Sequence, residues 1–261
     1  MIIDSLTHVT PDGRWFNTSH DAREARLLRE MDAAGVERAV VVALAGFIPN
    51  EFVFDVCARH PGRLIAGASF NPAAHATPQA AAGEFRAELR GAPFRVLKLH
   101  PRLNRYDPLD PRVAAVLEEL AGWHEHKLVW LDTLFYHAGG RLRKPPVDTL
   151  HELVSCHPDL TFVLLHAGGP WMLQLAWAIR ECANAWLDAS FTLRRYQGSS
   201  VAVDLAYLLR TFDRRMTSGS DFPEIGIGEA VADLRALGAG LPDDKTANVL
   251  GRNLATLLDK G

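Results

Sequence analysis

Cysteine is scarce in this 261-residue chain, and its spacing gives no recognisable motif. The three cysteines, Cys57, Cys156 and Cys182, form no C-x-x-C pair. An odd number of cysteines in a chain without a secretion signal is typical of a reducing compartment, so we expect a cytoplasmic protein. None falls at the end of an expected strand, which argues against a cysteine nucleophile. We therefore expect all three to fill the core.

Long apolar runs and a concentration of one charge are also missing. No uncharged apolar stretch reaches the ~18 residues of a membrane-spanning helix. The start, Met1-Ile2-Ile3-Asp4, has no basic segment before an apolar run, as a signal peptide would. The net charge is -3, and Lys and Arg are scattered instead of forming a stripe that could follow a phosphate backbone. We therefore expect a small-molecule substrate and neither a membrane nor a nucleic acid as partner. Whether the protein forms a homo-oligomer is left open by the sequence.

What the chain does have is a regular alternation of two patterns. Short apolar runs alternate eight times with segments of helical period, which predicts a parallel sheet covered by helices. The expected strands are residues 2–7, 39–44, 64–70, 94–99, 128–132, 161–165, 185–190 and 216–220. The length is close to the ~250 residues of one such barrel. The sequence therefore predicts an α/β fold, a (β/α)8 TIM barrel, as a single domain over residues 1–261.

One-sided helices support this prediction. Apolar side chains at Val113, Val116, Leu117 and Leu120 follow the spacing i, i+3, i+4, i+7. An additional C-terminal helix follows the eighth unit and is expected to pack on the outside of the barrel, through Val249, Leu250, Leu254, Leu257 and Leu258. The rival fold, an open doubly wound sheet that binds a nucleotide, needs a glycine-rich turn after the first strand. Here that turn reads Thr7-His8-Val9-Thr10-Pro11, so the barrel is favoured.

Polar side chains gather where the strands end. They are His8, Asn71, Lys98, His100, Asp132, His166, Asp188, Ser190 and Asp221. The active site of a TIM barrel lies at the C-terminal ends of its strands, so we expect these residues around one pocket. Simpler roles remain open for some of them. Asp188 and Ser190 can satisfy backbone groups, and His100, before Pro101, can cap or pack.

Five motifs occur in register along the chain. They are Ile3-Asp4-Ser5-Leu6-Thr7-His8, Lys98-Leu99-His100-Pro101, His166-Ala167-Gly168-Gly169, Gly219-Ser220-Asp221-Phe222-Pro223 and Asn248-Val249-Leu250-Gly251-Arg252-Asn253. Together they resemble the amidohydrolase-2 family of metal-dependent hydrolases and decarboxylases, which includes aminocarboxymuconate-semialdehyde decarboxylase. The resemblance covers essentially the whole chain.

This resemblance implies a divalent metal ion, usually zinc, with ligands on strands 1, 5 and 8 and a strand 6 histidine as acid or base. Asp221, His166 and His8 match three of the family's positions. Leu6 replaces the first strand 1 histidine, and Asp132 stands where the strand 5 histidine is expected. The remaining ligand set, His8, Asp132 and Asp221, is rich in oxygen and suits manganese better than zinc. We expect an altered site that binds metal weakly or has lost it.

The chemistry expected of this rim is acid/base catalysis on an anionic substrate. We expect a hydrolase or decarboxylase with His166 as acid/base and Asp221 as base or metal ligand. The substrate-binding candidates are Lys98, His100, Arg102, Arg194 and Arg195, although exposed charges are often only solvated. Gly168-Gly169-Pro170 is expected to offer backbone N–H groups to an anion. The aromatic residues Trp15, Phe16, Phe135 and Tyr136 are expected to form a lid or pocket wall, or merely to cover the barrel.

Two other functional classes remain. A barrel that has lost catalysis could serve as a ligand- or partner-binding protein, and a lyase or isomerase of unrelated chemistry could use the same fold. A binding protein has no reason to keep His8, His166 and Asp221 together, so the rim favours an enzyme.

Overall fold

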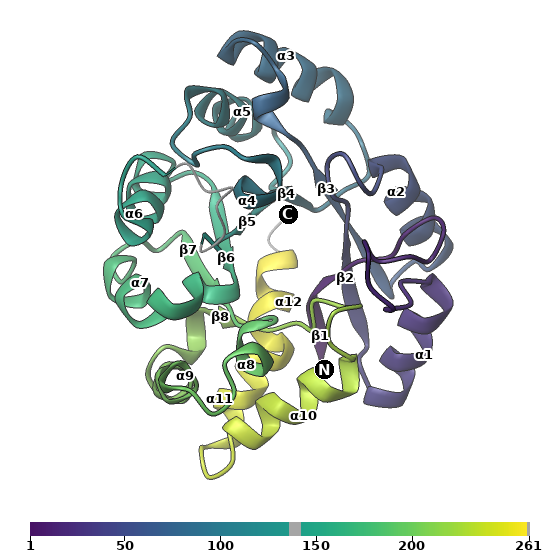
Figure 1. The fold of residues 1–261 in the computed structure, drawn as a ribbon, viewed down its shortest axis with the longest axis vertical. Coiled ribbons are helices and arrows are strands. Elements are labelled where there is room, and N and C mark those ends of the chain that lie inside the picture. The colour runs from purple at the N-terminus through teal and green to yellow at the C-terminus, as the bar shows by residue number, and fades with distance from the viewer. Residues whose placement is uncertain (136–141, 260–261) are drawn as a thin grey trace.

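Eight parallel strands form one sheet in the computed structural model, which describes residues 1–135 and 142–259. The strands are β1 (Ile3–Thr7), β2 (Arg38–Val42), β3 (Leu64–Ser69), β4 (Val96–Leu99), β5 (Leu128–Asp132), β6 (Thr161–Leu165), β7 (Ala185–Asp188) and β8 (Met216–Thr217). They follow one another around the barrel in sequence order (Figure 1). The predicted (β/α)8 fold is confirmed, and the expected strands differ from the observed ones only at their ends.

Helices surround the sheet and connect successive strands. They are α1 (Glu24–Ala34), α2 (Asn50–Arg59), α3 (Pro78–Leu89), α4 (Pro101–Asn104), α5 (Pro111–Ala121), α6 (Pro146–Cys156), α7 (Met172–Ala178), α8 (Thr192–Arg195), α9 (Ser200–Thr211), α10 (Ile227–Leu237), α11 (Asp243–Ala247) and α12 (Asn253–Leu258). Several begin with proline, whose fixed φ and missing N–H suit a first helical turn. Side-chain caps help to fix two of these starts, since Thr77 accepts from Ala80 N and Asp110 from Arg112 N. None of the described helices could cross a membrane.

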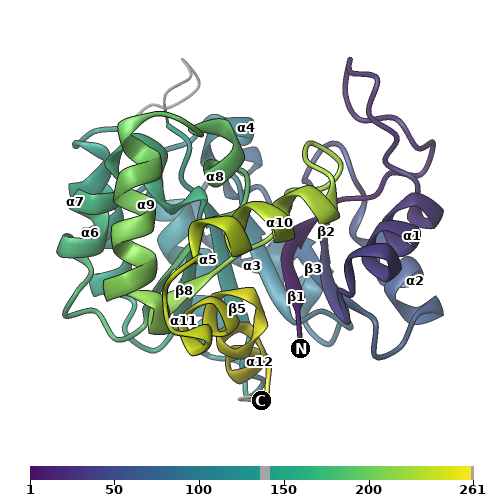
Figure 2. The same cartoon turned by 90° about the horizontal axis from the view of Figure 1, so that it is seen from below.

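The C-terminal helix closes the bottom of the barrel. Figure 2 shows α12 below the N-terminal ends of the strands, while α4 and α8 lie at the opposite end. Leu254, Leu257 and Leu258 belong to the same buried cluster as inward-facing strand residues such as Trp130 and Val163. The expected outside packing of this helix is therefore wrong for α12. It fits only the preceding turn, where Val249 joins the outer layer between sheet and helices.

The cysteines differ in burial. Cys57 is buried as expected, whereas Cys182 is half-buried and Cys156 is exposed. The expectation that all three fill the core is thus correct only for Cys57, because the other two lie at or beyond the C-terminal ends of α6 and α7. All three are free thiols.

The barrel closes where the segment after β8 meets β1. Asp221 N donates to Leu6 O at 2.9 Å, and His8 N donates to Phe222 O at 2.8 Å. Two residues before Asp221, Gly219 lies so close to β1 that a Cβ atom there would come within 2.6 Å of Leu6 N. The glycine of the Gly-Ser-Asp motif therefore allows the closing contact that positions both His8 and Asp221.

We expect Gly219→Ala to destabilise the protein by about 1–3 kcal/mol or more, because the added methyl group must push β1 and the β8 segment apart. Gly83→Ala is the matched control. Gly83 is exposed in α3 and has nothing within 4 Å of the position of a Cβ. This change should stabilise by roughly 0.4–1 kcal/mol. Urea unfolding measures both, and equal effects of the two changes would contradict the proposed close approach.

Candidate active site

A cavity of about 390 Å³ lies at the C-terminal end of the barrel. Its polar lining comprises His8, Lys98, His100, Arg102, Asp132, His166, Arg195, Asp221 and Glu224. Strand alternation explains much of this set. On β5, Leu128 and Trp130 face the barrel interior, so Asp132 does too. On β4 the same alternation turns Lys98 inward after Val96.

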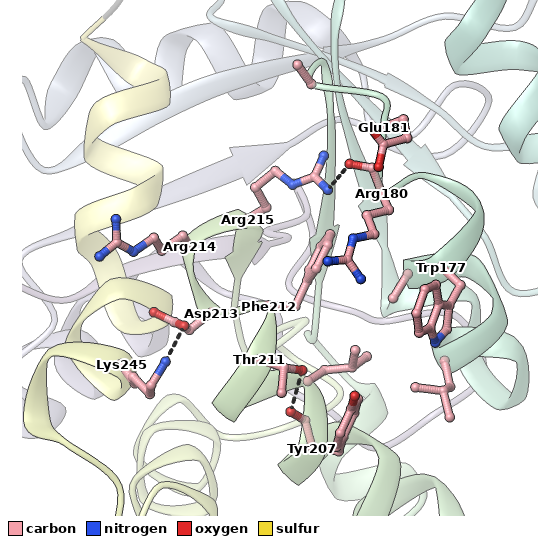
Figure 3. A pocket seen from close by; sticks show the side chains of 14 residues that line it. Trp177, Arg180, Glu181, Tyr207, Thr211, Phe212, Asp213, Arg214, Arg215 and Lys245 are labelled. Atoms are coloured by element: carbon pink, nitrogen blue, oxygen red, sulfur yellow. Dashed lines mark hydrogen bonds and ion pairs between the residues drawn. The ribbon is translucent and has the colours of Figure 1, made fainter.

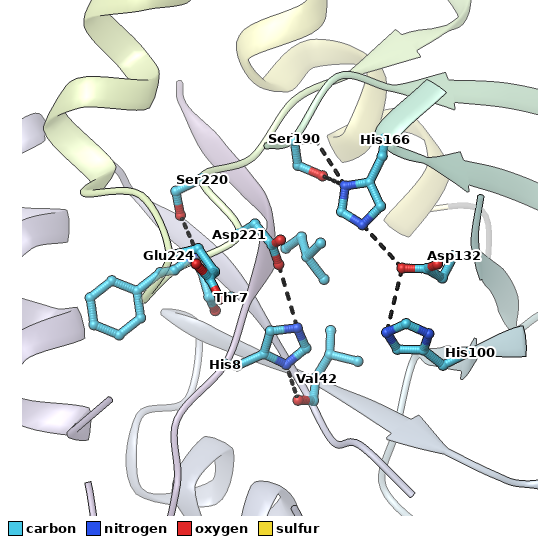
Figure 4. Close-up of polar contacts among 12 residues, drawn as sticks. Thr7, His8, Val42, His100, Asp132, His166, Ser190, Ser220, Asp221 and Glu224 are labelled. Carbon is cyan, nitrogen blue, oxygen red and sulfur yellow. Dashed lines mark hydrogen bonds and ion pairs between the residues drawn. The ribbon is translucent and has the colours of Figure 1, made fainter. Parts of the chain in front are cut away.

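Asp132 is the electrostatic centre of one side of the cavity. Its Oδ2 lies 3.4 Å from His100 Nε2 and 3.3 Å from His166 Nε2 (Figure 4). Its Oδ1 lies 3.5 Å from Arg102 Nε. Burial alone would raise the pKa of Asp132, but His100, His166 and Arg102 hold it well below its ordinary value. The carboxylate is therefore ionised although it is fully buried.

His100 faces Asp132 as a neutral ring. Its Nδ1 accepts from Leu103 N at 3.4 Å, so the proton is on Nε2, toward Asp132. Burial keeps the pKa of His100 well below its ordinary value. His100 therefore has both roles expected of it: it caps the turn of α4, and it lines the cavity.

His166 differs from His100 in its protonation, because its surroundings favour the positively charged ring. Its Nδ1 donates to Ser190 O at 3.0 Å, while Nε2 faces Asp132, so both ring nitrogens meet acceptors. Burial alone would lower the pKa of His166, but Asp132 and Asp221 raise it above its ordinary value. The two acceptors and the raised pKa both favour the imidazolium form of this ring.

His8 and Asp221 form the other side of the cavity. His8 Nδ1 donates to Val42 O at 2.7 Å, and its Nε2 lies 3.6 Å from Asp221 Oδ1 (Figure 4). Burial, reinforced by the positive charge of Lys98, lowers the pKa of His8 to about 3. Nε2 thus presents a lone pair to the cavity. Burial raises the pKa of Asp221, although His166 and Lys98 oppose the shift.

Two aromatic side chains, Trp15 and Phe16, form the wall of the cavity next to His8. Glu224, which was not predicted from the sequence, holds Trp15 in place. The ring of Trp15 stacks on His8 with 5.2 Å between centroids, and Phe16 packs edge-on against Trp15. Trp15 Nε1 donates to Glu224 Oε1 at 2.6 Å. The apolar lining at Leu44, Leu103, Leu134 and Phe191 was also missed. The sequence could have indicated Glu224, since it follows Asp221 by three residues in the same loop.

Comparison of the whole chain with protein families gives a clear match. The family model described as Amidohydrolase matches residues 3–259. The chain belongs to this family. Among curated proteins no match was found. Similar solved structures include an uncharacterised TIM-barrel protein from Bordetella bronchiseptica, at 20% identity, TM-score 0.78 and 98% coverage of both chains.

Two further solved structures carry activities in their names. One is a probable 2-pyrone-4,6-dicarboxylic acid hydrolase from Acinetobacter baumannii with citric acid bound (16% identity, TM-score 0.70, 98% of each chain covered). The other is a 5-carboxyvanillate decarboxylase from Novosphingobium aromaticivorans, complexed with manganese and a nitrobenzoic acid (12% identity, TM-score 0.65, 99% of this chain and 96% of that one). At these identities the likeness shows the fold alone.

Some expected residues lie away from the cavity of this family member. Arg194 points to α10, where its Nε lies 2.8 Å from Asp233 Oδ2. Asn71 caps the turn after β3 by accepting from Ala73 N. Asp188 is buried in the barrel wall, where it accepts from the hydroxyl groups of Ser5 and Thr217.

The expected anion site after His166 is wrong. Gly168 N donates to Thr133 Oγ1 at 2.8 Å, and Gly168 and Gly169 are both buried, so this N–H is not available to a ligand. The expected aromatic cover is only partly found. Trp15 and Phe16 line the cavity, and Phe135 is buried without lining it. Tyr136 lies outside the described residues.

A larger hollow, of about 850 Å³, lies outside the barrel along α7 and α9 (Figure 3). Its charged groups are largely occupied: Lys245 pairs with Asp213, and Arg215 donates to the carbonyl groups of Ile179 and Cys182. In the described part of the chain this hollow has no histidine in its lining. The histidines that could act as acid or base therefore line the smaller cavity.

The three expected metal ligands do not form one donor set. His8 faces Asp221, whereas Asp132 is engaged with His100, His166 and Arg102. Leu6 has no lone pair and packs into the interior cluster. Over residues 1–135 and 142–259, no group of three or more His, Cys, Asp and Glu side chains is arranged to hold a metal ion. A carboxylate already facing a guanidinium and two imidazoles fits a divalent ion poorly.

The assigned charge states can be tested without a substrate. In ¹⁵N-correlated NMR spectra of the imidazole groups, His8 should remain neutral with its proton on Nδ1 from pH 8 down to about 5, because its pKa is lowered to about 3. His166 should be doubly protonated at pH 7, because its pKa is raised. His8→Asn and His166→Gln identify the two signals. A His8 signal that titrates near the ordinary value of 6.5 would contradict the assignment.

Proposed function

We propose that this family member is an enzyme that hydrolyses a small anionic organic molecule. The observation that carries the proposal is that two titratable groups of one cavity, His166 and Asp221, both have a pKa raised above the ordinary value. The raised pKa favours the protonated form of His166 and makes the carboxylate of Asp221 a stronger base, which suits an acid and a base in catalysis. A protein that only binds a ligand does not need these two shifts.

The proposed base is Asp221. His8 Nε2 and Asp221 Oδ1 are both acceptors, and they face each other at 3.6 Å. A water molecule placed against both would donate one hydrogen to each, leaving an oxygen lone pair directed at the substrate. Asp221 would take the proton as the water oxygen bonds to the electrophilic carbon. The neutral ring of His8 positions this water.

The proposed acid is His166. Its 3.3 Å contact with Asp132 Oδ2 is longer than the ~2.7–2.9 Å of a strong charge-assisted hydrogen bond. The proton on Nε2 is therefore not locked to Asp132 and can pass to the leaving group as its bond to carbon breaks. Water supplies the hydroxyl group of the product, and the proton held by Asp221 then restores His166. Atoms and charges balance without an oxidant or reductant.

The substrate class follows from the lining. Lys98, Arg102 and Arg195 bring positive charge to the cavity, while Trp15 and Phe191 supply apolar surface. A volume of about 390 Å³ suits a small organic molecule. Decarboxylation is the second candidate, because His166 could instead protonate the carbon from which CO2 leaves. The decarboxylase among the similar structures makes this worth testing.

We expect His166→Gln and Asp221→Asn each to lower kcat by roughly 10²-fold or more, because each removes one proton-transfer partner. The assay is a panel of carboxylate-bearing lactones, esters and benzoates, followed by proton release for hydrolysis and CO2 release for decarboxylation. His151→Gln, in an exposed position on α6, is the matched control and should be silent. Activity within a few-fold of wild type in both site variants would remove this site from the reaction.

The pH profile of kcat/KM should be bell-shaped. The rate should fall at low pH as Asp221 becomes protonated, at a pKa above the ordinary 3.8, and fall at high pH as His166 loses its proton, at a pKa above 6.5. The residual activity of His166→Gln should lose the alkaline limb and keep the acid limb. An unchanged alkaline limb in that variant would assign the acid to another group.

Substrate recognition by charge can be separated from general surface charge by two neighbouring residues. Arg195 lines the cavity, whereas Arg194 is paired with α10. Arg195→Ala should raise KM about tenfold for an anionic substrate through loss of one charge contact, and Arg194→Ala should leave KM within twofold. The same KM change in both variants would indicate only a long-range effect of net charge.

A further inference from the structure

Lys98 is a buried cation without a close partner. Its side chain is 1% exposed and lines the cavity. Within the described ranges, the ammonium group of Lys98 makes no hydrogen bond. No carboxylate oxygen of the described residues lies within 4.0 Å of its Nζ, so it forms no ion pair with them. Most buried lysines in proteins are paired, because removing an ammonium group from water without compensation is costly. An unpaired one at the floor of a cavity therefore needs an explanation.

The neighbouring carboxylates do not supply it. Burial lowers the pKa of Lys98, and Asp132 and Asp221 oppose this shift from longer range. Asp132 is nevertheless turned toward His100, His166 and Arg102, and Asp221 faces His8. Asp188, deeper in the wall, is satisfied by hydroxyl and backbone donors. The three donors of the ammonium group thus remain available to a ligand.

The register of the sheet sets the depth of this cation. In the backbone register of the sheet, Lys98 lies beside Trp130 of β5 and Ser69 of β3. It therefore belongs to the inward-facing layer just below that of Asp132. Its long side chain therefore rises from the interior layer and reaches the cavity from below. The ammonium group shares this cavity with His8 and Asp221 at the proposed water site and with His166, the proposed acid, and its charge acts to lower the pKa of both histidines.

We propose that the Lys98 ammonium group binds the reacting oxygen of the substrate and takes the role of a metal ion, so that hydrolysis needs no divalent metal. This inference rests on the proposed function. As the water oxygen bonds to the carbonyl carbon, the electron pair of the C=O bond moves to the oxygen held by Lys98. It returns when the leaving group departs with the proton of His166. Stabilising such developing negative charge is often a large contribution to catalysis.

The central variant is Lys98→Met, which keeps the length of the side chain and removes its charge. We expect the melting temperature of the variant to rise by about 2–4 °C, because an unpaired buried charge is removed. We expect kcat to fall roughly 10²-fold with little change in KM. Malonate, used as a probe anion, should raise the melting temperature of the wild type but not of the variant. Lys144→Met, which removes an exposed lysine paired with Glu152 on α6, is the control and should keep the malonate effect.

Metal dependence gives an independent readout. Wild-type protein purified without an affinity tag, equilibrated with limiting zinc or manganese and desalted, should retain well under one equivalent of metal. After treatment with EDTA its rate should be unchanged. Restoration of a lost rate by zinc or manganese would overturn the proposal, because the metal would then supply the positive charge.

Two other outcomes separate the proposals. A lower melting temperature for Lys98→Met, with malonate still bound, would identify Lys98 as a structural counter-ion of Asp132 and Asp221, and would overturn the inference while leaving the proposed acid and base intact. If His166→Gln and Asp221→Asn keep wild-type rates while the rate and malonate binding still depend on Lys98, the proposed acid and base fail but the anion site at Lys98 is supported.

Discussion

The buried carboxylate of Asp132 determines the state of the groups around it, because a negative charge at that depth must be met by donors. Arg102, His100 and His166 meet it from three directions. Its charge keeps a proton on His166 against the effect of burial. It also fixes which nitrogen of His100 carries hydrogen. Without this carboxylate, three donors would face one another at a buried site, and the acid of the proposed reaction would lose the charge that holds its proton.

A second constraint acts across the barrel, where Asp221 and His8 depend on the closing contact between β1 and the segment after β8. The backbone bonds of Leu6 and His8 to that segment set the position of both side chains. Gly219 lets the two segments approach closely enough for these bonds to form. The base side of the cavity is therefore fixed by backbone geometry, whereas the acid side is fixed by charge.

Much of the cavity could be predicted from the sequence because strand ends in a TIM barrel converge. His8, Lys98, His100, Asp132, His166 and Asp221 follow strands that apolar patterning locates, and all six line the cavity. Patterning does not give side-chain direction outside strands. Arg194 and Arg195 are adjacent in a short helix, so they point to different places, and only Arg195 reaches the cavity. The contacts of Asp132 with His100 and Arg102 could not be predicted either, since they depend on distances between different strands.

The terminal helix was predicted, but its place beneath the barrel was not, because its apolar spacing suits packing on the outside and packing beneath the barrel equally well. Because α12 covers the interior layer from below, residues 253–258 complete the core that the first strand begins. During synthesis, a nascent chain would carry all eight strands while this lower opening still exposed Trp130 and its apolar neighbours to water. Productive closure of the barrel must therefore wait for residues 253–258 to leave the ribosome, and a chain cut short before Leu254 should be a target for chaperones and proteases.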